Sequence, residues 1–319
     1  MMGGLEGLKQ AISKDMHAKL PKQRKTQRVN LSEAIATVLH LQTVNTSVIA
    51  AGLPRQAERI DMRCQWLLRL LGNPHIIPFE VMKPYACEVL QQLAKAGKSI
   101  VLVMDQTRIN KTFEMVMVGV HIQNRALPLG WVIKKTQGSI GFDEQVQVLN
   151  TVGAWIPEGS KVILMGDRAY GTPDLIEWCQ DQKWDYRLRL KGNIQTYQGL
   201  KPVPASALPK GAHHNIPITH KRIHTNLGII HEEDHPQSWI IAMSAQANDY
   251  KTLDYGMRWG IEAMFSDFKS RGFSLESSQM KLADHLGRLI LMVSIALYWA
   301  VSTGYWVTQH ESILHQKKR

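Results

Sequence analysis

The chain has 319 residues, a formal net charge of +11 and a pI near 9.5. This length allows one large domain or two to three small ones, and the charge favours a polyanionic partner such as nucleic acid. The three cysteines lie far apart, which excludes a disulfide framework and a cysteine metal site and indicates a cytosolic protein. The polar start predicts no signal peptide.

The first third, residues 1–97, is predicted to be helical and to bind DNA. Its first 28 residues are rich in lysine and arginine, which indicates a basic arm for phosphate contact or a disordered tail. Helices are expected over 31–44 and 55–71, and one face of the second carries an arginine at every fourth residue: Arg55, Arg59 and Arg63. This pattern fits docking on duplex DNA, or equally a helical bundle with a solvated basic face.

From Lys98 the pattern changes to alternating strands and helices, which is typical of α/β packing. Two short, apolar, β-rich runs are predicted to be buried strands, and each delivers an aspartate, Asp105 or Asp167. The expected order is three strands, helix, strand, helix, strand, over residues 99–105, 112–122, 126–136, 141–155, 161–166, 172–180 and 185–190. An aspartate after a strand is often a turn former or helix cap, but ligand chemistry also gathers at strand ends in open α/β sheets.

Residues 194–245 are rich in Pro, Gly, His and Asn and are predicted to form a small β insertion. Trp239, on a predicted strand there, is either a sheet-face core aromatic or a stacking partner for an extruded base. Arg189 is placed to line a DNA channel. Arg168, next to Asp167, is a similar candidate, with a structural salt bridge as its alternative.

The most informative stretch is 255–269, which is predicted to form an amphipathic helix. Tyr255, Arg258, Glu262 and Lys269 fall on one narrow stripe, while Met257, Ile261, Met264 and Phe268 form a core-packing face. A carboxylate between two cations and a phenol suits a metal ion and a phosphodiester. A solvated charged face is the alternative.

Together, Asp105, Asp167 and Glu262 supply the three carboxylates of a two-metal phosphoryl-transfer site. Mg²⁺ prefers oxygen ligands and is held by few carboxylates plus substrate phosphate, and two such ions activate the attacking oxygen and stabilise the leaving one. Asp105 is predicted to bridge the ions, with Asp167 and Glu262 each completing one. Arg258 and Lys269 are predicted to hold phosphates.

The chain resembles transposases of the IS4 group, relatives of the Tn5 and Tn10 enzymes. Its Tyr255, Arg258, Glu262 and Lys269 match the group's signature of Tyr, two residues, Arg, three residues, Glu, six residues, Lys. Asp105 and Asp167 match the other two acids. The resemblance implies an α/β fold: an RNase H-like mixed sheet with helices on both faces, interrupted by a small β insertion and preceded by a helical N-terminal domain.

The resemblance also implies that the chain is a DDE transposase, which cuts transposon ends and joins the freed 3′ ends to target DNA. The cofactor it implies is two Mg²⁺ ions per active site, with Mn²⁺ as a substitute. The partners implied are double-stranded DNA and a second copy of the chain, forming a homodimer on paired ends. Several members pass through a DNA hairpin, for which Trp239 is a candidate stacking residue. A nuclease without strand transfer and a transposase-derived DNA-binding protein are the alternatives.

The predicted parts are a helical DNA-binding region over 1–97, catalytic segments over 98–193 and 246–319, and the insertion over 194–245. Residues 289–301 are strongly apolar but too short for a membrane span, which predicts a buried core or subunit-contact helix and no membrane partner. The expected location is the bacterial cytoplasm, on the nucleoid when DNA is bound.

Overall fold

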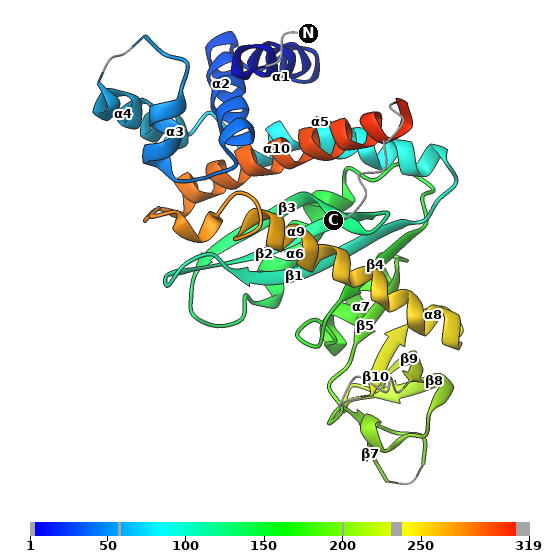
Figure 1. Cartoon of the computed structure of the whole chain (residues 1–319). Helices are drawn as coiled ribbons and strands as arrows, with labels where there is room; N and C mark the ends of the chain where they lie inside the picture. The colour runs from blue at the N-terminus through cyan, green and yellow to red at the C-terminus, as the bar shows by residue number, and fades with distance from the viewer. Residues whose placement is uncertain (1–3, 57–58, 200, 231–237, 311–319) are drawn as a thin grey trace, which may run out of the picture. The chain divides into compact units, whose positions relative to one another are not determined.

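The computed structural model describes residues 4–56, 59–199, 201–230 and 238–310. Its contacts divide the chain into two compact units, coloured by residue number in Figure 1. The helical unit comprises Met1–Tyr85 and Ser266–Arg319, and the sheet unit comprises Ala86–Phe265.

The helical unit is built from helices that pack on α2 and α10. Its elements are α1 (Leu5–Lys19), α2 (Lys25–Leu41), α3 (Thr46–Gly52), α4 (Ile60–Leu71), the start of α5 (Pro78–Lys95), the short 3₁₀ helix η3 (Leu275–Ser277) and α10 (Ala283–His310). The side chain of Asn45 caps α3 by accepting hydrogen bonds from the backbone of Ser47 and Val48. Helix α10 supplies much of the core, with Leu289, Val293 and Ala296 fully buried.

For the first 28 residues, the interpretation as a disordered tail is wrong, while phosphate contact by a basic arm stays a prediction. Residues Leu5–Lys19 form α1, whose Ile12 and Met16 are fully buried. The apolar residues Leu5, Leu8, Ile12 and Met16 recur every three or four positions and provide the packing stripe. The burial of this stripe outweighs the high charge of the segment.

The predicted basic helix face is also wrong, because α4 begins only at Ile60. Arg55 lies before the helix, where it pairs with Glu33 at 2.6 Å and stacks on Trp66. Arg63 donates hydrogen bonds to the carbonyls of Ala51 and Arg55. These arginines therefore close the loop onto the helices of their own unit.

Helix α10 confirms the predicted buried core helix and is longer than expected. Among the described residues, α10 alone is a single helix long and apolar enough to cross a membrane. The test segment is Ala283–Thr308, and 72% of its most apolar window is buried inside the protein. The pair α2 and α3 passes the same test together but is bent by 106°. Core helices pass such a test, so this finding is weak evidence for a span.

The described strands form one ten-stranded mixed sheet in the order β3-β2-β1-β4-β5-β10-β9-β8-β6-β7. Strand β1 is parallel to β4, and β4 is parallel to β5, while the other pairings are antiparallel. The strands are β1 (Ile100–Arg108), β2 (Phe113–Ile122), β3 (Arg125–Lys135), β4 (Val162–Gly166), β5 (Asp185–Arg189), β6 (Gln195–Thr196), β7 (Val203–Pro204), β8 (Gly211–Ile218), β9 (Ile223–Ile230) and β10 (Trp239–Met243).

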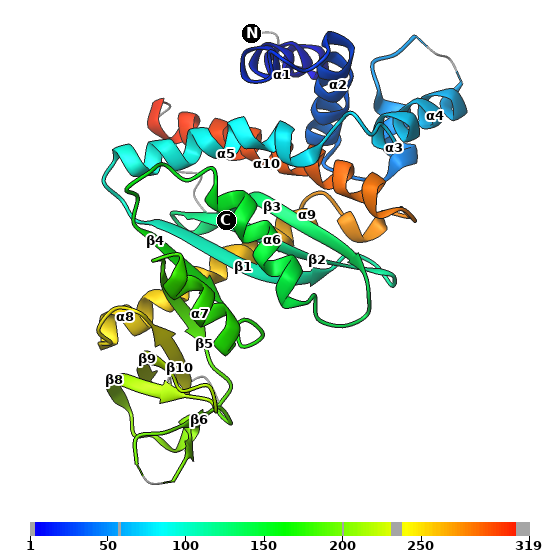
Figure 2. The ribbon, with the colours of Figure 1, turned by 180° about the vertical axis from the view of Figure 1, so that it is seen from behind.

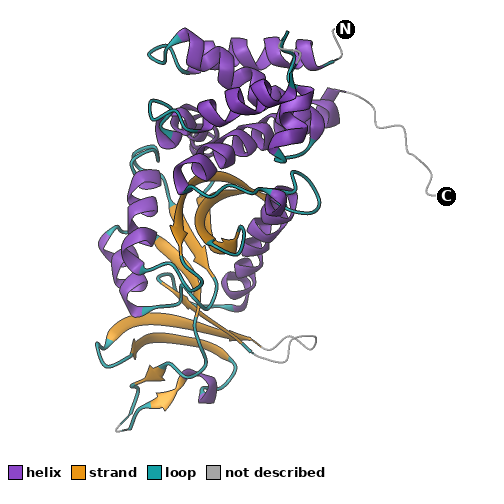
Figure 3. Ribbon diagram, turned by 90° about the vertical axis from the view of Figure 1, so that its left-hand side faces the viewer, coloured by secondary structure: helices purple, strands orange, loops and turns teal. Residues whose placement is uncertain are grey.

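Helices cover both faces of the β1–β5 part of this sheet. Helix α9 (Gly260–Phe268) lies in front of β1 and β2 in Figure 1, whereas α6 (Phe142–Gly153) and α7 (Pro173–Asp181) lie on the opposite face, in front in Figure 2. Figure 3 shows the same layers by secondary structure. The expected mixed α/β fold with a helical N-terminal region is thereby confirmed, and it is consistent with an RNase H-like transposase fold.

The strands of residues 194–245 extend the central sheet through β10. Strand β10 pairs antiparallel with β5 on one side and with β9 on the other. The short 3₁₀ helix η1 (Ala205–Ala207) follows β7, and α8 (Asp249–Leu253) with the 3₁₀ helix η2 (Asp254–Trp259) leads back to α9. The sheet thus places the segment after β10 close to the ends of β4 and β5.

Candidate active site

Asp105 and Asp167 lie on neighbouring parallel strands. Met104 of β1 pairs with Gly166 of β4. Asp105 and Asp167 each follow one of these paired residues, so they occupy the same level on adjacent strands. Asp167 directly follows the end of β4, as the sequence predicts. Asp105 differs from the expectation: β1 continues to Arg108, so Asp105 lies within the strand and pairs with Met117 of β2.

Local hydrogen bonds orient both carboxylates. Asp105 Oδ1 accepts from the backbone N–H of Gln106 at 2.8 Å, and Asp167 Oδ1 accepts from that of Ala169 at 2.8 Å. The turn after Asp167 packs so tightly on β5 that a Cβ at Gly171 would collide with the carbonyl of Arg189. This close approach requires glycine and fixes the loop that carries Asp167.

The stretch predicted as a single helix is a 3₁₀ helix followed by an α-helix. Tyr255 and Arg258 lie in η2, and Glu262 lies in the first turn of α9. In a 3₁₀ helix, residues three apart eclipse each other, so Tyr255 and Arg258 still face the same way. The predicted core face is confirmed for Ile261, Met264 and Phe268, whereas Met257 is half-buried.

The Arg258 guanidinium joins the sheet to the helix. Its Nη1 donates to Asp105 Oδ2 at 3.2 Å, and its Nη2 donates to Glu262 Oε1. Arg258 is 8% exposed, while the Glu262 side chain is open to solvent. Asp105 and Glu262 therefore each accept a hydrogen bond from a different terminal nitrogen of one buried guanidinium.

The charges of the three acids act on one another. Burial, followed by the negative charge of Asp167, raises the pKa of Asp105 to about 6, and Glu262 adds to this rise. The backbone hydrogen bond from Gln106 and the charge of Arg258 oppose it. Asp105 is thus a buried carboxylate whose pKa stays raised even though Arg258 lies beside it.

Residues 134–299, over half of the chain, match the family described as the transposase DDE domain. The chain belongs to this family. Membership makes it a nucleic-acid-processing transposase with DNA as its partner, and divalent metal ions are typical of the family. The match covers Asp167 and Glu262 but begins after β1, so the role of Asp105 is argued from its geometry. No curated protein matches the chain.

The donor set of this transposase fits a divalent ion, although no three acid, histidine or cysteine side chains among the described residues are grouped closely enough to hold one ion. Arg258 lies between Asp105 and Glu262 and occupies oxygens that an ion would use. A two-metal site needs only two of the carboxylates per ion, because water and phosphate supply the remaining ligands. A buried carboxylate whose pKa is raised by like charges is also the kind of group that a cation stabilises.

Tyr255 belongs to a cluster of aromatic side chains with Trp239 and Trp259. The ring of Trp239, 2% exposed, packs edge-on against Tyr255 at 5.2 Å and Trp259 at 5.5 Å. Of the two interpretations of Trp239, the core aromatic is therefore confirmed, and base stacking stays a prediction. Tyr255 is itself buried, burial raises its pKa to about 12, and its hydroxyl has no hydrogen-bond partner among the described residues.

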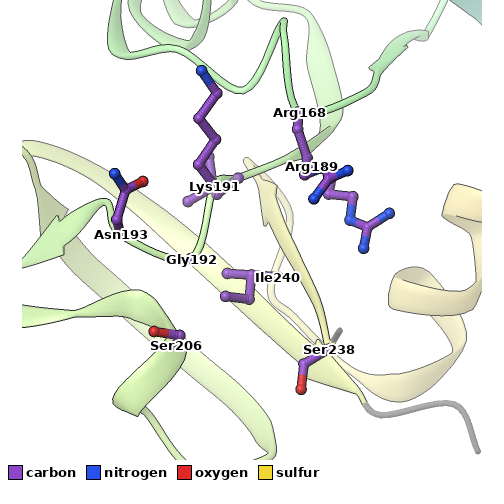
Figure 4. A pocket seen from close by; sticks show the side chains of 9 residues that line it. Arg168, Arg189, Lys191, Gly192, Asn193, Ser206, Ser238 and Ile240 are labelled. Atoms are coloured by element: carbon purple, nitrogen blue, oxygen red, sulfur yellow. The ribbon is translucent and has the colours of Figure 1, made fainter. Parts of the chain in front are cut away.

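A basic pocket of about 450 Å³ opens beside the loop of Asp167 (Figure 4). Arg168 and Arg189 lie close together in it, and the pKa of Arg189 is lowered first by burial and further by the charge of Arg168. Its polar lining consists of two arginines, a lysine, an amide and two hydroxyls: Arg168, Arg189, Lys191, Asn193, Ser206 and Ser238. This composition suits an anion with further hydrogen-bonding groups, such as a nucleotide phosphate.

Lys269 directly follows the last residue of α9 and belongs to the helical unit. Its Nζ lies 3.6 Å from Glu276. The predicted stripe of four residues is therefore realised for Arg258 and Glu262, which touch, while Lys269 lies beyond the helix.

Several residues of the site were missed by sequence reasoning. Tyr170 is buried, and its raised pKa is due first to burial and then to the charges of Asp105 and Asp167. Trp259 is 45% exposed beside Trp239, and its place next to Arg258 in the sequence could have predicted it as a site residue. No sequence signal predicts Ser206 and Ser238, because only the folded insertion brings these distant serines to one pocket.

Proposed function

We propose that this chain is an IS4-group transposase, similar to the Tn5 and Tn10 enzymes, that cleaves DNA at transposon ends and transfers the 3′ ends into target DNA. The observation that carries the proposal is the geometry around Asp105: the register of β1 and β4 places it next to Asp167, and Arg258 bridges it to Glu262. Burial first, and then the charges of Asp167 and Glu262, raise the pKa of Asp105, which supports the same grouping.

In this proposal Asp105 contributes to both Mg²⁺ sites, with Mn²⁺ as a substitute, and Asp167 and Glu262 each complete one. The ions, when bound, supply activation of the attacking oxygen and charge for the leaving oxygen. Water attacks in the cleavage step and the freed 3′ hydroxyl attacks in the transfer step, both in line at phosphorus. The protein's contribution is positioning and fixed charge.

The DNA phosphates would be held by cationic and polar groups around the acids. Arg258 offers a planar fork, and the Tyr255 hydroxyl is a buried donor or acceptor without a partner among the described residues. Lys269, which belongs to the helical unit, is proposed to contact DNA phosphate as a point charge. Arg168 and Arg189 line the basic pocket beside the Asp167 loop. A DNA strand that leaves the acids would meet these two arginines next.

The wider proposal assigns DNA binding to residues 1–97 and catalysis to 98–193 and 246–319, with 194–245 as the insertion. It includes a homodimer on paired transposon ends, action in the bacterial cytoplasm and contact with the nucleoid when DNA is bound. No membrane role is part of it.

Two assays test the proposal. Purified protein should nick plasmid DNA that carries the transposon ends when Mg²⁺ is present, and should join precleaved ends with free 3′ hydroxyls to a second DNA. Nicking without joining would identify a nuclease that lacks strand transfer. Specific binding with neither reaction would identify a transposase-derived DNA-binding protein and overturn the proposal.

A further inference from the structure

Arg258 has two of its three nitrogens engaged with acids that the proposed function uses as metal ligands. Nη1 contacts Asp105 on β1, and Nη2 contacts Glu262 on α9. Burial acts to lower the pKa of Arg258, but Tyr255, Asp105 and Glu262 outweigh it and raise the value. The guanidinium is therefore a permanent charge inside the site.

We propose that Arg258 is a positioning residue that serves as the internal counter-cation of Asp105 and Glu262 and exchanges between these carboxylates and a DNA phosphate. This inference rests on the proposed function, in which the two acids bind divalent ions. Its consequence is competition: a divalent ion gains these oxygens only as Arg258 leaves them.

The physical reason lies in the shared oxygens. A carboxylate oxygen that accepts from a guanidinium has one lone-pair direction fewer for a metal ion. The positive charge on Arg258 also repels a dication, and a partly buried site screens that repulsion less than water does. Both effects weaken metal binding while Arg258 stays in place.

Among the described residues, two buried polar groups, one on Arg258 and one on Tyr255, have unused hydrogen-bonding capacity. The Nε of Arg258 and the hydroxyl of Tyr255 are buried and have no hydrogen-bond partner in the part of the chain that the structure describes. Such groups cost free energy when they stay unpaired. The guanidinium carbon lies 5.8 Å from the centre of the Tyr255 ring, so the two groups belong to neighbouring side chains. A phosphate that draws Arg258 away from the acids would offer its donors new acceptor oxygens. Hydrogen bonds to a phosphate would thus offset the free energy lost when Arg258 leaves the two acids.

Linkage then couples the two ligands. A phosphate that draws Arg258 away from the acids raises metal affinity, and a bound ion raises DNA affinity by the same factor. Metal loading would in this way be favoured on DNA and disfavoured in the free protein.

The test is titration calorimetry of Mn²⁺ into the full chain without DNA. Arg258→Gln should bind Mn²⁺ about tenfold more tightly than the wild type, because the competing cation is gone. Arg189→Gln is the matched control: it removes the same charge near Asp167 without removing either of the hydrogen bonds that Arg258 donates to Asp105 and Glu262. The control should tighten binding clearly less.

Unchanged or weaker Mn²⁺ binding by Arg258→Gln would overturn the inference. It would show that Arg258 only links Asp105 to Glu262 structurally. Where that variant does not fold by circular dichroism, Arg258→Lys decides: it should tighten Mn²⁺ binding by a smaller factor, because an ammonium keeps the charge but cannot hold both acids by a planar fork. A short DNA duplex should strengthen Mn²⁺ binding less in the variant than in the wild type. An equal gain in both would contradict the coupling.

Asp105→Asn and Glu262→Gln separate this inference from the proposed function. If neither changes Mn²⁺ affinity, the proposed metal site itself fails. If both weaken Mn²⁺ binding but Arg258→Gln does not tighten it, only the role of Arg258 fails.

Discussion

In the helical unit, Arg28, Arg63 and Arg288 donate hydrogen bonds to backbone carbonyls of their own unit. In the sheet unit, Arg258 instead contacts two acids, and Arg168 and Arg189 line an open pocket. The helical unit thus uses arginine to hold its fold, and the sheet unit places arginine where a ligand can reach it. A net charge of +11 does not by itself locate the DNA-contacting surface.

The largest expected effect is at the acids. Asp105→Asn, Asp167→Asn and Glu262→Gln should each lower DNA cleavage by on the order of 10³-fold, because each removes a ligand of the proposed metal ions, whose positive charge stabilises the reacting phosphate. Binding to end DNA in a gel-shift assay should stay nearly intact. Full cleavage activity in any one variant would overturn the role given to that residue.

Trp239→Ala should lower the free energy of unfolding by about 3–5 kcal/mol, because it empties a core position. Urea denaturation measures this loss, and Trp259→Ala, at an exposed position, should cost less. Because Trp239 is buried, nicking and any hairpin step should fall together. A selective loss of the hairpin step would show instead that Trp239 contacts an extruded base.

Arg187 is the sheet unit's own internal arginine, 3% exposed and paired with Asp185 at 2.9 Å. Burial raises the pKa of Asp185, but the Ser244 hydroxyl and Arg187 outweigh it and bring the pKa below 3.8. Asp185→Asn should therefore cost about 1–3 kcal/mol of stability at neutral pH, because Arg187 loses its partner.

The pH dependence gives the sign of this effect. The contribution of Asp185 is present above its unfolded pKa and is lost as the pH falls through its lower folded pKa. The stability gap between the wild type and Asp185→Asn should thus narrow below about pH 4. A gap that stays constant to pH 2 would contradict the ion pair.

Arg63→Ala should cost about 1 kcal/mol of stability, because carbonyls lose their donor, and should leave the salt dependence of DNA binding unchanged. Arg189→Ala should do the reverse, lowering the slope of log affinity against log salt by about 1 with little loss of stability. A flatter slope for Arg63→Ala would remove the distinction between the two units.

The sequence predicted the strands well, because β1, β4 and β10 are short, apolar and β-rich. It also predicted that Asp105 and Asp167 lie on neighbouring strands, since parallel strands bring their ends to one edge, while the grouping of both with Glu262 around metal ions stays a prediction. It misplaced α1 because charge was weighed above the stripe of Ile12 and Met16. It could not show that Arg258 turns towards Asp105, because that contact depends on how a 3₁₀ helix packs on the sheet.

The most direct test of the central claim is a crystal structure with Mn²⁺ and end DNA, using the anomalous signal of manganese. The account predicts two peaks roughly 4 Å apart, with Asp105 on both, Asp167 on one and Glu262 on the other, and Arg258 turned to a phosphate. Peaks that leave Asp105 without a metal contact would contradict it.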